Sequence, residues 1–171
     1  MGESEPEPAD RAAYIAAAWA RERPDLPVAS IGILTRIWQV AKLASDDRRR
    51  TLAALGMDAA TLDLLSTLRR AGPPYRLSTR ELTARSLVTA GAITQRVDRA
   101  QRSRLVRRLP PERGSRVVLV QLTPDGHSAV DAAVGAVLNR EQRMVDVLDP
   151  LHQEQLGVML AALLRGFEEL A

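Results

Sequence analysis

The chain has 171 residues, of which 46% are hydrophobic, 26% charged and 3% aromatic, and its formal net charge is +3. This composition is typical of a soluble domain, and a chain of this length buries about 70% of its extended surface without needing a disulfide or a metal. The lack of cysteine and the presence of only two histidines exclude thiol catalysis, disulfide scaffolds and cysteine or histidine-rich metal sites. We therefore expect no catalytic residues, no metal and no cofactor.

The N-terminal part is expected to hold a tail and two helices. Residues 1–9 are acidic and interrupted by proline, which predicts a disordered tail and is unlike the basic start of a signal peptide. No apolar run reaches the roughly 18 to 20 residues of a membrane helix, so we expect a cytoplasmic protein with no membrane contact. Residues 10–56 are predicted to form N-terminal dimerisation helices, one over 10–23 and a longer one that ends at Gly56.

Residues 57–123 carry the signals of a winged helix-turn-helix domain that binds DNA. Asp58 is a good N-cap for a helix that ends at Gly72, and Ser78-x-x-Glu81 is the spacing of a capping box. A break then leads into a second short helix over 92–102, and two such helices joined by a short turn describe a helix-turn-helix. The alternating segments 105–109 and 117–122 predict a hairpin wing. The expected fold class is mainly α with a small β-hairpin wing.

Residues 124–171 are predicted to form C-terminal dimerisation helices. One helix begins near Thr123 and runs to about Leu148, and a last one covers 151–170 with an apolar face too broad for a helix that faces solvent. Apolar stripes at both ends of a small domain need a partner surface, so we expect a homodimer.

Positive charge is concentrated in the middle of the chain. Residues 69–116 contain thirteen arginines and three acidic residues, a net of +10, whereas residues 117–171 contain three arginines and eight acidic residues, a net of −5. Arginine presents a planar fork of donors that suits phosphate groups and guanine edges. The distribution favours one face that binds a polyanion, and the alternative is an arginine-rich surface that is merely solvated.

Double-stranded DNA is the expected partner, because the second helix and the wing offer suitable side chains. A helix in the major groove needs small and polar residues near its N-terminus, where the backbone approaches phosphates and side chains reach base edges. Glutamine can bond adenine with two hydrogen bonds, and arginines in a wing can enter the minor groove. The candidate DNA-binding residues are Thr89, Gly91, Thr94, Gln95, Arg99, Arg113 and Arg116.

Residues 77–126 resemble the winged helix-turn-helix core of the MarR family of bacterial transcription regulators. Residues 19–27 (WARERPDLP) and 62–77 (LDLLSTLRRAGPPYRL) are similar to its urate-responsive subgroup, in which an additional N-terminal helix packs on the dimer. The chain departs from the family at Gly114, where an aspartate usually orients the wing arginine, and at Arg104, where a glycine is common. Because the aspartate is missing we expect a less rigid wing, and because the glycine is missing we expect a less favourable C-terminal end of the recognition helix.

The same resemblance implies a pocket for a small anionic effector such as urate. In the subgroup this pocket is marked by a tryptophan, an aspartate and two arginines, and the matching residues are Trp19, Asp63, Arg96 and Arg108. Two guanidinium groups attract an organic anion, and an indole offers a stacking face. Alternatively, Trp19 is a core residue and Asp63 forms a structural salt bridge with Arg96 or Arg108. The effector can equally be another organic anion.

Together these features predict a ligand-responsive transcriptional repressor that binds a pseudo-palindromic operator as a homodimer. The alternative is an architectural DNA-binding protein without sequence specificity, or a helical interaction protein, with no small-molecule ligand. An enzyme is the least favoured reading, because the sequence offers no nucleophile, base or metal set beyond scattered carboxylates.

Overall fold

The computed structural model describes residues 10–86, 88–110 and 117–170. The predicted N-terminal tail and three residues of the predicted wing turn, Arg113, Gly114 and Arg116, lie outside these ranges. Backbone contacts divide the chain into two compact units, residues 1–47 and 48–171, which we describe separately.

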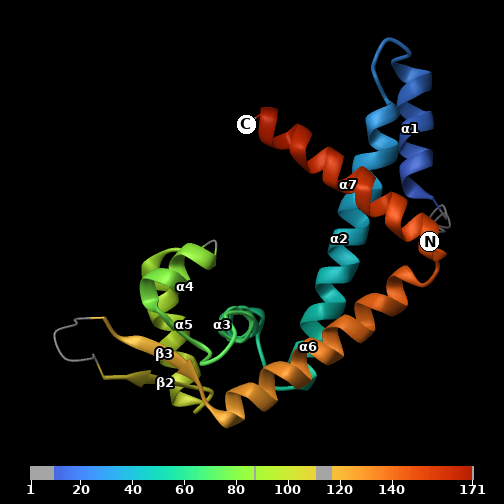
Figure 1. Ribbon diagram of the computed structural model, residues 1–171. Helices are drawn as coiled ribbons and strands as arrows, with labels where there is room; N and C mark the ends of the chain where they lie inside the picture. The colour runs from blue at the N-terminus through green and yellow to red at the C-terminus, as the bar shows by residue number, and fades with distance from the viewer. Residues whose placement is uncertain (1–9, 87, 111–116, 171) are drawn as a thin grey trace, which may run out of the picture. The chain divides into compact units, whose positions relative to one another are not determined.

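The helices and strands follow the predicted order, with one additional strand (Figure 1). Their bounds are α1 Arg11–Glu22, α2 Ala29–Ala54, α3 Ala59–Arg70, β1 Arg76–Ser78, α4 Thr79–Arg85, α5 Ala90–Arg102, β2 Val106–Leu109, β3 Leu119–Leu122, α6 Pro124–Val145 and α7 Pro150–Leu170. The predicted fold class, mainly α with a small β wing, is confirmed.

The first unit contains α1 and the N-terminal part of α2, which continues into the second unit. Asp10 caps α1 by accepting a hydrogen bond of 3.1 Å from the backbone N–H of Ala13, and its carboxylate also pairs with Arg36 of α2. The expected apolar stripe of α1 is largely exposed: Tyr14 is 59% and Trp19 is 49% accessible.

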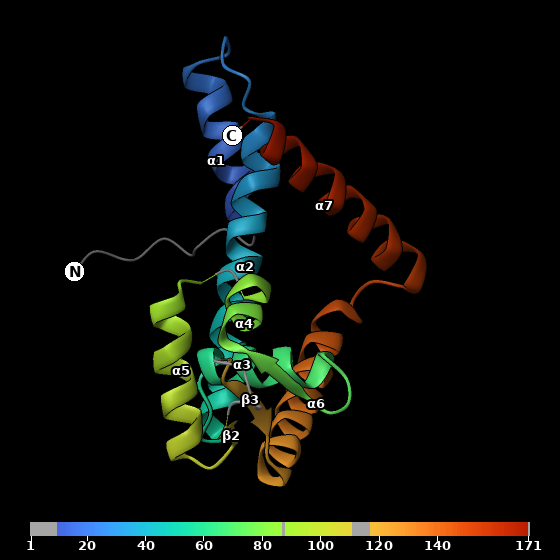
Figure 2. The ribbon, with the colours of Figure 1, turned by 60° about the vertical axis from the view of Figure 1, so that its left-hand side comes forward.

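The second unit holds the hydrophobic core. Its central residues repeat at helical spacing on α3 and α5, as the sequence predicts, and alternate on the strands. Figure 2 shows α5 and α4 grouped beside α3. The fully buried large side chains of this core are Leu52, Leu64, Leu65, Leu68, Leu82, Ile93, Val97, Val106, Val120 and Val130. Burial of each such side chain contributes roughly 1.5 to 3 kcal/mol, so this packing holds the helix-turn-helix in place.

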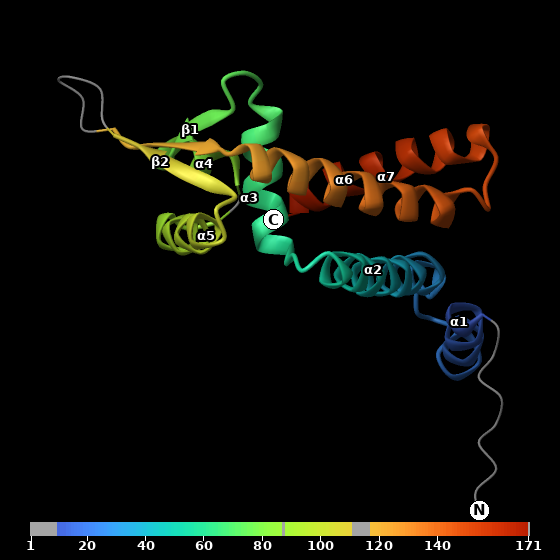
Figure 3. The same cartoon turned by 90° about the horizontal axis from the view of Figure 1, so that it is seen from below.

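The three strands form one antiparallel sheet in the order β1-β3-β2. Val120 of β3 lies between Leu77 of β1 and Arg108 of β2, and Val106 pairs with Leu122. Figure 3 shows β2 above α5, and α6 following directly from β3. The hairpin was predicted from the sequence, whereas β1 was not, because three residues are too short for an alternating pattern to be recognised.

α6 begins in close contact with the residues just before β2. The Thr123 hydroxyl accepts a hydrogen bond from the Gly126 N–H at 3.0 Å and donates one to the carbonyl of Arg104 at 2.7 Å. Gly126 is buried, and a Cβ placed there would lie 1.9 Å from the carbonyl oxygen of Leu105. Only glycine fits this position without a shift of the backbone.

α7 exposes most of its apolar side chains. Those with more than a third of their surface accessible are Leu151, Leu156, Val158, Met159, Leu160, Leu164 and Phe167. Within the described residues no single helix is long and apolar enough to cross a membrane, and one bent pair, α2 with α3, meets the length and composition requirements jointly.

Candidate functional site

The helix-turn-helix is built by two capped helices. Ser78 and Glu81 form the predicted capping box of α4: the Ser78 hydroxyl accepts from the Glu81 N–H at 3.2 Å, and the Glu81 carboxylate accepts from the Ser78 N–H at 2.8 Å. The backbone N–H and hydroxyl of Ser78 hold the pKa of Glu81 below its ordinary value. Thr89 caps α5 by accepting from the Ala92 N–H at 3.3 Å, so its hydroxyl has a structural role beside its predicted contact with DNA.

α5 has one polar, exposed face and one buried face. Ile93, Val97 and Ala100 are buried against the core, and Thr94, Gln95, Asp98 and Arg99 between them are exposed. The exposed stripe, which we call the α5 outer face, consists of Gly91, Thr94, Gln95, Asp98 and Arg102. It therefore contains three of the predicted DNA-binding residues, and a Cβ at Gly91 would meet open space.

Arg99 lies at the edge of α5 that faces α3. Its guanidinium donates to the carboxylate of Asp58 at 2.7 Å, and both side chains are about half exposed, at 56% and 49%. Asp58 is also the N-cap of α3. The Thr61 backbone N–H, and after it the Thr61 and Arg99 side chains, hold the pKa of Asp58 below its ordinary value. Exposed ion pairs are worth only about 0 to 1 kcal/mol, so a DNA phosphate can replace Asp58 as the partner of Arg99 at little cost.

Among the four predicted effector residues, the structure joins Asp63 and Arg96. The Arg96 Nη1 atom donates to the Asp63 carboxylate at 2.6 Å and links α5 to α3, which is one of the two salt bridges that the sequence allowed. The Arg96 side chain is 20% exposed and that of Asp63 is 43% exposed, so the pair is reachable from solvent. Trp19 belongs to the other unit.

Arg108 does not join the Asp63–Arg96 pair. Its guanidinium donates to the Asp98 carboxylate at 2.6 Å and to the Gln101 side-chain oxygen at 2.9 Å. Asp98 and Arg96 are two residues apart on one helix, which places their side chains on different sides of α5. The two arginines of the predicted pocket thus have separate carboxylate partners.

A cavity that the sequence did not reveal lies between α3 and α6, beside the end of α2. Its volume is about 580 Å³, and its lining is mostly apolar. The charged lining residues are Arg48, Arg69, Arg70 and Asp131, and the apolar ones include Leu62, Val134, Val137 and Leu138. A largely apolar hollow with a few polar groups is the usual form of a small-molecule site.

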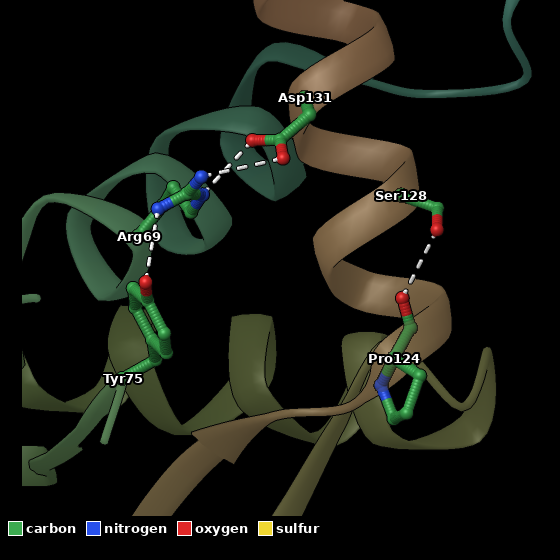
Figure 4. Close-up of polar contacts among 5 residues, drawn as sticks. All are labelled: Arg69, Tyr75, Pro124, Ser128 and Asp131. Carbon is green, nitrogen blue, oxygen red and sulfur yellow. Dashed lines mark hydrogen bonds and ion pairs between the residues drawn. The ribbon is translucent and has the colours of Figure 1, made fainter. Parts of the chain in front are cut away.

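One wall of this cavity is an ion pair between α3 and α6 (Figure 4). Arg69 donates to the two carboxylate oxygens of Asp131 at 2.9 and 3.4 Å, and to the Tyr75 hydroxyl at 3.4 Å. The edge of the His127 ring packs on Tyr75, with centroids 4.5 Å apart. Arg69 holds the pKa of Asp131 below its ordinary value. No group of three or more potential metal ligands occurs in the part of the chain that the structure describes.

A helix-turn-helix followed by an antiparallel hairpin, with the second helix polar on its outer side, defines the winged-helix class of DNA-binding regulators. Comparison with known proteins supports this class and narrows it to one family. The model of the MarR family matches residues 55–116. The chain is 31% identical over 140 residues to the transcriptional regulator PecS of Dickeya dadantii (strain 3937), covering 80% of this chain and 81% of PecS. The chain therefore belongs to the MarR family, and it is a DNA-binding transcriptional regulator.

Two solved structures share the fold. Sco3205, a MarR family regulator from Streptomyces coelicolor solved with DNA, is 25% identical, with a TM-score of 0.66 and coverage of 81% of this chain and 92% of that one. NadR, solved in complex with 4-hydroxyphenylacetate, is 21% identical, with a TM-score of 0.58 and coverage of 75% and 89%. The likeness to NadR concerns the fold alone.

Proposed function

We propose that the protein is a homodimeric, effector-responsive repressor that binds a pseudo-palindromic operator and is released from it by a small organic anion such as urate. The observation that carries the effector part of this proposal is the Asp63–Arg96 ion pair, because it ties the candidate recognition helix α5 to α3 and is open to solvent. A ligand that replaces one member of this pair changes how α5 is held.

The dimer is supported by the apolar side chains that α7 exposes, including Val158 at 64% and Phe167 at 51% accessibility. Contiguous exposed apolar surface of this kind marks an interface in a folded protein. A second copy of the same chain would cover this face and place two α5 helices in successive major grooves, about 34 Å apart.

The effector is expected to compete with Asp63 for Arg96. Urate is a planar anion, and a guanidinium group binds such an anion with parallel hydrogen bonds. In the subgroup that the sequence resembles, a tryptophan supplies a stacking face, and the matching residue, Trp19, is half exposed in its own unit. Arg108 bonds Asp98 and Gln101 instead, so this proposed effector site does not include it.

A second candidate effector site is the cavity between α3 and α6. The bound molecule in NadR, 4-hydroxyphenylacetate, is an aromatic carboxylate. The apolar lining of the cavity and the Arg69 guanidinium suit that chemistry, and a bound carboxylate would displace Asp131 from Arg69. Each of the two sites offers an arginine guanidinium, so both suit the same class of effector, an organic anion.

The test is binding of the purified protein to the DNA directly upstream of its own gene, measured by fluorescence anisotropy against a scrambled duplex, with and without urate or 4-hydroxyphenylacetate. We expect specific binding that one of these anions releases. Asp63→Asn should reduce the urate-dependent change in DNA Kd, with Asp25→Asn, which alters an exposed pair with Arg23, as the matched control. Arg69→Gln should instead reduce release by 4-hydroxyphenylacetate.

The possible results separate the alternatives. Equal affinity for the scrambled duplex would contradict the repressor and favour an architectural DNA-binding protein. Specific binding that neither anion changes would contradict the effector part alone. An unchanged urate response in Asp63→Asn would remove the ion pair from the mechanism.

A further inference from the structure

Arg108 is held by two side chains of the candidate recognition helix. It lies on β2, and its guanidinium bonds Asp98 at 2.6 Å and Gln101 at 2.9 Å, two residues one turn apart on α5. These two bonds use two of the five N–H groups of the guanidinium, so it keeps donors for a further acceptor. The side chain is 32% exposed. It is thus both fixed in position and accessible.

The cluster of Asp98, Gln101 and Arg108 adjoins the α5 outer face, the surface proposed to contact DNA. Asp98 belongs to the α5 outer face, three and four residues after Gln95 and Thr94, so all three side chains lie on one side of the helix. Arg108 lies beside this face. Arg96, by contrast, turns toward α3 and its partner Asp63.

The charges around Arg108 suit an anion. An open hollow of about 490 Å³ is lined by Asp98, Gln101, Arg102 and Arg108. Two cations against one carboxylate leave a net charge of +1, and the bond to Arg108 compensates the only negative charge in the lining. An uncompensated carboxylate on this face would repel DNA, so its pairing with Arg108 removes an obstacle as well as orienting the guanidinium.

We propose that Arg108 contacts a backbone phosphate of DNA next to the α5 outer face, and that Asp98 and Gln101 are positioning residues that hold its guanidinium for this contact. The proposal rests on DNA binding through α5. It assigns Arg108 to the DNA interface, whereas the family resemblance placed it in the effector pocket. Because a phosphate contact carries no base information, Arg108 would set the affinity and the register of the complex.

The test is operator affinity of the full-length protein as a function of salt, with the effector response measured in parallel. Arg108→Gln should weaken binding about tenfold at 0.15 M salt and lower the slope of log Kd against log salt by about 1, since about 0.9 counterion is released per phosphate contacted. Arg108→Lys should keep the slope of the wild type. The Kd of the DNA-free protein for urate should not change in either variant.

Arg107→Gln is the matched control, because Arg107 is the neighbouring arginine on β2, points to the opposite face of the sheet and bonds Gln121. It should leave the salt slope closer to that of the wild type than Arg108→Gln does. Should Arg108→Gln fail to fold, Gln101→Ala keeps the cation while it removes one of its two supports, and it should weaken binding with the slope unchanged.

Two results would overturn the proposal. If Arg108→Gln binds the operator with unchanged Kd and slope but loses its urate response, Arg108 belongs to the effector site. If the wild type binds no DNA specifically, the proposed function fails with it, whereas an unchanged Kd in Arg108→Gln beside a wild type that binds removes only the role of Arg108.

Discussion

Replacement of Gly126 by alanine should destabilise the protein strongly. The added Cβ would lie 1.9 Å from the Leu105 carbonyl oxygen, 2.9 Å from the Leu105 carbonyl carbon and 3.2 Å from the Leu122 side chain. Carbon and oxygen atoms that are not bonded come no closer than about 3.2 Å, so the start of α6 and the backbone of Leu105, just before β2, must separate by more than about 1 Å. Because the obstacle is backbone, no change of side-chain rotamer can relieve it.

We expect this substitution to cost about 3 kcal/mol, at the upper end of the range for overpacked sites. In a chain of this size that corresponds to a fall in Tm of roughly 6 to 12 °C. The assay is thermal unfolding followed by circular dichroism at one fixed protein concentration, because self-association also raises Tm.

Gly135→Ala is the matched control on the same helix, since a Cβ there meets no atom within 4 Å. Alanine favours a helix over glycine by about 0.5 to 1 kcal/mol, so this variant should be slightly more stable than the wild type. A Tm of Gly126→Ala within 2 °C of the wild type would refute the close packing of α6 on the backbone of Leu105.

Three further outcomes follow from contacts in the second unit. Ser78→Ala removes the capping box of α4 and should cost about 1 kcal/mol in denaturant unfolding, whereas Ser128→Ala, on an exposed hydroxyl, should stay within about 0.5 kcal/mol. Arg69 lowers the pKa of Asp131, so the stability that this pair adds is present above the unfolded pKa of about 3.8 and is lost as pH falls through the folded value. The difference in Tm between wild type and Asp131→Asn should therefore shrink toward zero on acidification, and a difference that stays constant would contradict this. Gln95→Ala should weaken operator binding by about 1 to 3 kcal/mol and leave scrambled DNA unaffected, as a titration of both duplexes will show.

Features of the fold that depend on near neighbours were predictable from the sequence. The caps at Asp58 and Ser78 need only a side chain and a backbone N–H three residues later, and both were predicted and confirmed. Buried positions such as Leu65, Ile93 and Val97 likewise follow the helical spacing of apolar residues, which is visible in the sequence. The family itself was predicted from residues 77–126, where cap, helix and wing signals occur together, and the comparisons confirm it.

Contacts between distant segments were harder to predict. The sequence showed Asp63 and two candidate arginine partners, but only the packing of β2 on α5 decides that Arg108 bonds Asp98 instead. The network around Tyr75 was missed because it joins residues that are far apart in the sequence: Arg69 bonds Asp131, and Tyr75 packs against His127. The cavity between α3 and α6 arises from three helices whose facing side chains are far apart in the chain.

In the proposed function the protein acts as a dimer whose two α5 helices bind one face of an operator. The most direct test is a hydroxyl-radical footprint on the DNA upstream of its gene, with and without the effector. We expect two protected patches whose centres are about 10 to 10.5 base pairs apart, both lost when the effector is added. A single patch, or uniform protection along the duplex, would contradict it.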